Sequence, residues 1–159
     1  MRAARVLDRL RLLVPPRVTA AVLRTWFNGW CTKHRFQGRG ACIFGCSMGA
    51  DKVDHYMRCT RLHGHGLARL RLPFSGTAEE RGLCFFLFEC IGQLTHGVPA
   101  RRALLLTAAY KLHCRLRYRR GFANAEEQRR ALDQAVKEAA LGHAGAMRVP
   151  DGIWATLAV

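Results

Sequence analysis

Apolar side chains recur every three or four positions along much of the chain, which is the spacing of helices that pack through one face. The pattern predicts a helix over residues 2–13, ended by the two prolines that follow it, and a second helix from about residue 17 to 29. One apolar stripe runs along this second helix, formed by Val18, Val22, Trp26 and Trp30. Large aromatic side chains in such a stripe favour packing against a core over stacking on nucleotide bases.

Three more helices are predicted in the C-terminal half. A capping box of Thr77 and Glu80 opens a helix that is apolar nearly all round, ends near residue 92 and is expected to be the central one. Pro99 at the first helical position opens the next helix, which runs to about residue 120. Asn124, with Glu127 three residues later, caps the last long helix. The sequence therefore predicts a mainly α fold with a bundle of about four to five helices.

Residues 36–60 depart from this helical spacing. A glycine-rich hairpin or loop leads to Cys42 and Cys46, and a short helix is expected to carry His55 and Cys59 one turn apart on the same face. The spacing is C-x3-C-x8-H-x3-C, and three thiolates with one neutral imidazole complete a closed tetrahedral site for one structural zinc ion. We therefore expect a small CCHC zinc finger attached to the helical bundle.

The competing interpretation is a set of buried free cysteines, which are common inside intracellular domains. Gly45 and Gly49 favour the metal site, because a loop that folds around an ion needs sharp turns. Cys31 is a possible substitute ligand, whereas Cys84 and Cys90 fall on an apolar helix and are predicted to be buried thiols. The odd number of cysteines, seven, and the lack of a secretory signal pattern argue against a disulfide framework and favour a reducing compartment.

The chain carries 26 Lys and Arg against 11 Asp and Glu, a formal net charge of +15. This excess predicts a polyanionic partner, RNA or DNA first, although a solvated basic surface has the same composition. The cations expected to contact phosphate near the finger are Arg35, Arg39, Lys52, Arg58 and Arg61. A second basic face on a C-terminal helix combines Lys111, Arg115 and Arg119. Stacking on an unpaired base is considered for Phe44 or Tyr56, with packing on the metal loop as the favoured role.

The first segment, MRAARVLDRLRLLVPP, is Arg-rich, amphipathic and nearly free of acids, a composition shared with mitochondrial transit peptides. We expect an intracellular, reducing location, with the nucleus or cytoplasm favoured over the mitochondrion. No apolar run approaches the roughly 20 residues that a membrane-spanning helix needs. A membrane span is therefore not expected.

The predicted organisation has three segments: amphipathic helices over residues 1–35, the finger over 36–60, and a helical region over 61–159 that packs as one unit with the rest. Zinc binding contributes on the order of 10 kcal/mol to the folding of small fingers. Chelation is therefore expected to melt the finger while the long C-terminal helices survive.

Two segments, LRTWFNGWCTKHRFQ and ACIFGCSMGADKVDHYMRC, resemble the zinc-binding region that follows the polymerase in non-LTR retrotransposon reverse transcriptases. The likeness is greatest to retroelement-derived copies in dinoflagellate algae. The later stretches RRALLLTAAYKLHCRLRYRR, RALDQAVKEAALGH and DGIWA resemble the tail of those copies. Within the resemblance, four ligand positions are matched by Cys42, Cys46, His55 and Cys59. The flanking pattern is matched by Asp51, Asp54 and Tyr56.

The resemblance implies a zinc-stabilised, basic nucleic-acid-binding module that helps to hold template RNA or target DNA. The chain has no Y-x-D-D or comparable pair of aspartates to hold the two magnesium ions that nucleotide transfer needs. It is therefore expected not to be an enzyme, and it looks like a detached C-terminal part of such a polymerase. The alternative is a structural or interaction subunit of a ribonucleoprotein or organellar complex, whose protein partners the sequence does not indicate.

Overall fold

The computed structural model describes residues 2–38, 40–46, 49–72, 82, 98–116, 122 and 124–140. This part of the chain is mainly helical and contains no β-strand, which confirms the predicted class. In chain order its helices are α1 (Arg2–Leu13), α2 (Pro16–Trp26), the 3-10 turn η1 (His34–Phe36), α3 (Val53–Tyr56), α4 (Thr60–Leu70), α6 (Val98–Leu116) and α7 (Ala125–Ala140). No helix within these ranges is long and apolar enough to cross a membrane.

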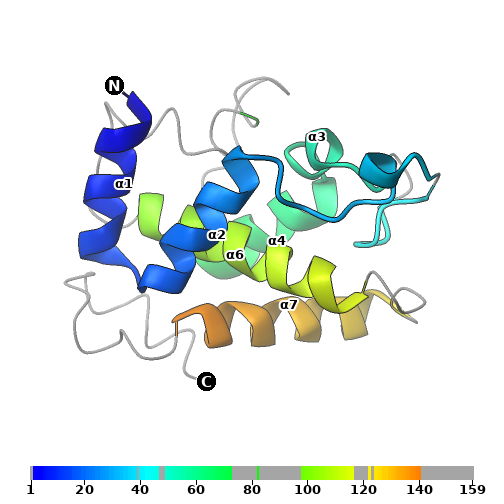
Figure 1. Ribbon diagram of the computed structural model, residues 1–159. Coiled ribbons are helices and arrows are strands. Elements are labelled where there is room, and N and C mark those ends of the chain that lie inside the picture. Colours follow the sequence, from blue (N-terminus) through cyan, green and yellow to red (C-terminus); the bar gives the residue numbers. More distant parts are fainter. Residues whose placement is uncertain are drawn as a thin grey trace.

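Helix α6 lies in the middle of the described helices, and α1, α2, α4 and α7 all pack against it (Figure 1). Neighbours can cover several sides of α6 because every residue from Ala103 to Ala109 is buried. The polar member of this run, Thr107, donates its hydroxyl hydrogen bond to the Ala103 carbonyl at 2.7 Å. The helix predicted over residues 77–92, expected to be central, lies outside the described residues apart from Gly82.

The N-terminal helices close against the C-terminal one. Val6, Leu10 and Val18 are buried in the same core as residues of α6 and α7, as their spacing predicts. At the start of α2, the Arg17 guanidinium donates a hydrogen bond to the carbonyl oxygen of Ala139 at 3.1 Å. The last carbonyl groups of a helix have no partner within it, so Arg17 caps the C-terminal end of α7.

The second helix ends at Trp26, three residues earlier than predicted. Asn28 adopts a left-handed conformation with φ 50°, which turns the chain out of the helix. Trp30 therefore lies beyond α2, yet its ring is fully buried and its indole Nε1 donates to the Thr25 hydroxyl oxygen at 2.8 Å. The predicted core role of Trp30 is confirmed, and its place on one continuous helical stripe is wrong.

The ends of the C-terminal helices follow the predicted signals. The side-chain oxygen of Asn124 accepts a hydrogen bond from the backbone N–H of Glu127 at 2.8 Å, so Asn124 caps α7. Helix α6 begins at Val98 and holds Pro99 in its first turn. The capping box of Thr77 and Glu80 falls outside the described residues.

Candidate metal centre

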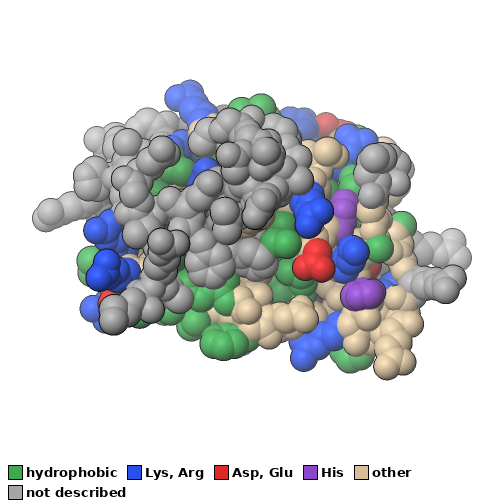
Figure 2. Space-filling view, turned by 90° about the horizontal axis from the view of Figure 1, so that it is seen from above, with side chains coloured by type: hydrophobic (Ala, Val, Ile, Leu, Met, Phe, Trp, Pro, Cys, Tyr) green, Lys and Arg blue, Asp and Glu red, His purple; other side chains and the backbone are tan. Residues whose placement is uncertain are grey.

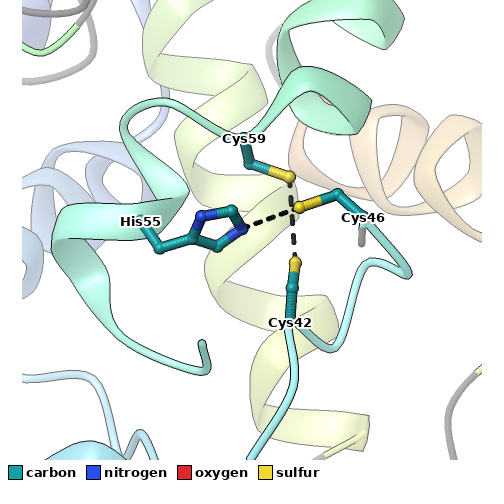
Figure 3. A group of neighbouring side chains, drawn as sticks. All are labelled: Cys42, Cys46, His55 and Cys59. Atoms are coloured by element: carbon teal, nitrogen blue, oxygen red, sulfur yellow. Dashed lines mark hydrogen bonds between the residues drawn. The ribbon is translucent and has the colours of Figure 1, made fainter. Parts of the chain in front are cut away.

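The side chains of Cys42, Cys46, His55 and Cys59 converge on one point (Figure 3). Their ligand atoms all lie within 4.8 Å of one another, and the three cysteines are buried. These four residues can therefore hold a metal ion. Cys31, the considered substitute, is not part of the cluster.

The distances within the cluster suit a tetrahedral ion. Two sulfurs at about 2.3 Å from a tetrahedral zinc lie about 3.8 Å apart. The Cys42 and Cys59 Sγ atoms are separated by 3.8 Å. Cys46 Sγ and His55 Nε2 are 3.0 Å apart, shorter than the roughly 3.5 Å of a bound pair, so these two ligands would separate slightly around an ion.

The first ligand pair is held by a turn and by one isolated antiparallel bridge between Ala41 and Ala50. The Cys42 N–H donates to the Gly49 carbonyl at 2.9 Å, and the Gly45 N–H donates to the Cys42 carbonyl at 3.1 Å. Gly45 has φ +68°, a conformation that favours glycine. The turn carrying Cys42 and Cys46 is thus present, while the described residues show this bridge in place of the predicted hairpin.

Gly49 matters because it has no side chain, which leaves room for the His55 ring, and its backbone conformation is ordinary. A Cβ atom at this position would lie 1.9 Å from His55 Nδ1 and 2.1 Å from Cε1. The imidazole therefore packs directly on the Gly49 backbone. The Nε2 atom of the same ring points toward Cys46 Sγ, as Figure 3 shows.

The second ligand pair differs from the prediction, because His55 and Cys59 do not share a helix. Helix α3 ends at Tyr56, and Cys59 is the N-cap of α4 with an extended backbone, φ −62° and ψ 113°. The Cys59 thiol consequently lies at the positive end of the α4 dipole. Its pKa is lowered, first by the hydrogen bond with the Cys42 sulfur and then by backbone amides of the first turn of α4, against the opposing effect of burial.

The other ligands have environments that a metal ion would exploit. Burial and then the nearby Lys52 ammonium lower the pKa of His55, which keeps the imidazole in the neutral form that binds metals. The pKa of Cys42 is raised by its hydrogen bond with the Cys59 sulfur and by burial, while the backbone amides of Cys46 and Phe44 oppose the shift. A cation among these sulfurs supplies the charge that lets all three ionise.

A buried carboxylate lies beside the cluster, at a residue that the sequence marked only as part of the flanking pattern of the resemblance. Asp51 is 2% exposed and accepts hydrogen bonds from the Lys33 backbone N–H at 2.9 Å, from the Tyr56 hydroxyl, and from His113 Nε2 at 3.1 Å. Burial by itself would raise the pKa of Asp51, but the hydrogen bonds from His113, Tyr56 and the Lys33 amide outweigh it and lower the pKa. We call residues 40–59, which carry the four cluster residues, the metal loop. Because His113 lies on α6, the Asp51 carboxylate fastens this loop to the central helix.

Aromatic rings fill the space between the metal loop and α6. The Tyr56 ring lies 5.4 Å from Trp30 and 5.1 Å from Phe44, and Trp30 lies 5.3 Å from the His113 ring. Phe44 and Tyr56 are both fully buried, so the considered stacking role is wrong and the packing role is confirmed. The Gln128 side chain of α7 also donates a hydrogen bond to the Phe44 carbonyl.

The cations predicted near the finger are mostly at the surface. Arg35, Arg58 and Arg61 are exposed, Lys52 is half-buried, and Arg39 lies outside the described residues. On the face drawn in Figure 2, Lys and Arg side chains recur across the described surface with few acidic side chains between them.

The second predicted basic face is partly neutralised. Arg115 is exposed and forms an ion pair with Glu138 of α7. Lys111 is half-buried, and Arg119 lies outside the described residues. The pKa of Glu138 is lowered first by the Arg115 hydrogen bond, with a smaller contribution from Lys111. Whether this face contacts nucleic acid stays a prediction.

In comparisons with known proteins, no family model, curated protein or solved structure matches the chain.

Proposed function

We propose that one structural zinc ion is bound by Cys42, Cys46, His55 and Cys59. We also propose that the region around this ion binds RNA or DNA. The convergence of four buried or half-buried donors carries the proposal. Three soft thiolates with one imidazole select zinc over magnesium or calcium, and a complete set of four protein ligands leaves no position for a reactive water. The ion therefore holds the loop and takes no part in catalysis.

Charge supports a polyanionic ligand. One Zn²⁺ with three thiolates sums to −1, so neighbouring cations rather than the ion attract phosphate. Residues 9–50 contain seven Lys and Arg and no Asp or Glu. Within this stretch Arg35 is exposed on η1, and beyond it Arg58 and Arg61 are exposed on either side of Cys59. Such a surface binds nucleic acid through phosphate contacts that carry no sequence information.

We further infer that the module derives from the region that follows the polymerase in non-LTR reverse transcriptases. The support is the sequence resemblance around residues 23–59 and the lack of paired polymerase aspartates. On this proposal the chain is a binding module without an active site.

We also infer a nuclear or cytoplasmic location, and the packing of the N-terminal segment is its support. Val6, Leu10 and Val14 of the N-terminal segment are buried in the common core. Removing α1 would uncover that core. A reporter fused to residues 1–30 should stay diffuse or nuclear, and mitochondrial import of the fusion would contradict this location.

Metal analysis of protein made without a purification tag tests the zinc site. We expect about one zinc per chain, and loss of most of it in Cys46→Ser and His55→Ala. Cys31→Ser and Cys114→Ser are matched controls, because both thiols lie outside the cluster. Full zinc content in Cys46→Ser together with His55→Ala would overturn the site.

A binding titration over salt concentration tests the nucleic-acid proposal. Each phosphate neutralised contributes a slope of roughly −0.7 to −0.9 in log K against log salt, so several contacts predict a steep fall. Arg58→Ala and Arg61→Ala should each reduce the slope by about one phosphate contact. Affinity that stays flat between low and physiological salt would contradict the mechanism.

A further inference from the structure

We propose that Phe27 and Phe36 form a stacking surface for the bases of a single-stranded nucleic acid. Phe27 is 80% exposed and Phe36 is 68% exposed. A base can stack on an aromatic ring whatever its identity, because every base has a π-face. The inference rests on the proposed nucleic-acid-binding function and names the form of ligand that this surface takes.

The backbone holds both rings outward. Phe27 is the C-cap of α2 and is followed by Asn28 at φ 50°; Phe36 ends η1 and is followed by Gln37 at φ 60°. Non-glycine residues adopt this left-handed conformation uncommonly, so the two turns are held by the structure around them.

A hydrogen bond ties the two turns together. Arg35 Nη1 donates to the Asn28 carbonyl at 2.6 Å, which joins the residue before Phe36 to the residue after Phe27. The fully buried Trp30 ring anchors the connecting segment through its bond to Thr25. The two phenylalanines are therefore presented by one anchored segment, and binding costs little ordering of the chain.

Charge selects the occupant. The exposed side chains of Lys33, His34 and Arg35 immediately precede Phe36. The acid that follows in the sequence, Asp51, is buried and engaged by hydrogen bonds. An apolar protein partner gains nothing from these cations, whereas a single strand offers phosphates to them and unpaired bases to the rings. A duplex hides its base faces and gains the phosphate contacts alone.

The test compares zinc-loaded full-length variants by fluorescence anisotropy on one mixed-sequence oligonucleotide, supplied as single-stranded RNA, single-stranded DNA and duplex DNA. Phe27→Ala and Phe36→Ala should each weaken single-strand binding about fivefold or more, the effect of losing one base stack. Duplex binding should change less than about twofold, since stacking is absent there. Leu12→Ala and Leu67→Ala are matched controls, because these side chains are 72% and 51% exposed on α1 and α4. The two single-stranded arms show whether ribose or deoxyribose is preferred.

An abasic oligonucleotide closes the test. If the rings stack on bases, removing bases from the strand should weaken wild-type binding, and Phe27→Ala with Phe36→Ala should then cost little more. Two results would overturn the stacking surface and leave the proposed function standing. One is a single-strand affinity that neither substitution changes, and the other is an affinity that both substitutions lower equally for single strand and duplex. A wild type that binds neither form would overturn both.

Discussion

At Asp51, donors from three separate parts of the chain meet one buried carboxylate: the Lys33 amide, the Tyr56 hydroxyl and His113 of α6. A buried charge is tolerated when hydrogen bonds satisfy it, and removing one partner leaves the others unsatisfied. Asp51 therefore positions the loop without belonging to the four-residue cluster.

Asp51→Asn should lower the free energy of unfolding by at least about 2 kcal/mol, because it breaks charge-assisted bonds in the core. Asp54→Asn is the matched control, because Asp54 is exposed on α3, and it should change the free energy of unfolding by less than about 0.5 kcal/mol. Urea denaturation measures both. The lowered pKa means that the carboxylate contributes fully above its unfolded pKa of about 3.9, and that the contribution is lost as pH falls through the lower folded value. The difference in unfolding free energy between wild type and Asp51→Asn should thus become smaller below about pH 4. Equal unfolding free energies at pH 7 would refute the role of Asp51.

Gly49→Ala should weaken zinc binding, since the added methyl group occupies the position of the His55 ring. Losing a contact that orients a metal ligand typically lowers metal affinity 10–100-fold. We expect a loss of about that size, measured in competition with a chelator. Gly64→Ala is the opposite control: nothing lies within 4 Å of its Cβ position inside α4, so stability should rise by about 0.5–1 kcal/mol. Unchanged zinc affinity in Gly49→Ala would contradict the packing of His55 on that glycine.

Among the elements, α7 links distant parts of the fold. It receives Arg17 of α2 at its C-terminal end and sends Gln128 to the Phe44 carbonyl beside the metal ligands. Helix α7 therefore holds the loop by a hydrogen bond to the loop backbone as well as by apolar contact.

Gln128→Ala should cost about 1–3 kcal/mol of unfolding free energy, because the Phe44 carbonyl is left without its partner. Gln134→Ala, exposed on the same helix, should cost less than about 0.5 kcal/mol. Thermal unfolding compares the pair, and a similar melting temperature for both variants would argue against the link.

Local patterns were sufficient to predict α1, α7 and the convergence of four Cys and His side chains, because helical spacing, caps and Cys/His spacing are local signals. They failed where tertiary contacts decide the path of the chain. Trp30 leaves α2 to reach the core, and Cys59 starts a new helix instead of continuing the helix of His55. The bond between Asp51 and His113 spans 62 residues and leaves no mark in the spacing of either residue.

Across the whole molecule, the metal loop and the helices share one core. Cys42, Phe44 and Tyr56 belong to the same buried cluster as Leu104 of α6 and Leu132 of α7. The loop is therefore not an appendage with its own small core.

Chelation should accordingly loosen more than the finger, contrary to the expectation from sequence that the C-terminal helices survive. Hydrogen exchange after chelator treatment should rise at residues 40–59 and also in α6 around His113, where the loop is fastened. Helix α1 is the internal reference, because it is remote from the four cluster residues in sequence and packs on α2 and α6. Increased exchange confined to 36–60 would show that the finger unfolds alone.

The contact between Arg17 and the end of α7 has a consequence for how the protein is made. The chain leaves the ribosome N-terminus first, so α2 must wait for residue 139 before its arginine finds its acceptor. The four metal ligands are all synthesised by residue 59, long before α6 and α7. On the zinc proposal, a nascent chain can therefore meet the metal while most of its core is still missing. A shortage of the metal would then lower its uptake during translation, before the complete fold exists to retain it.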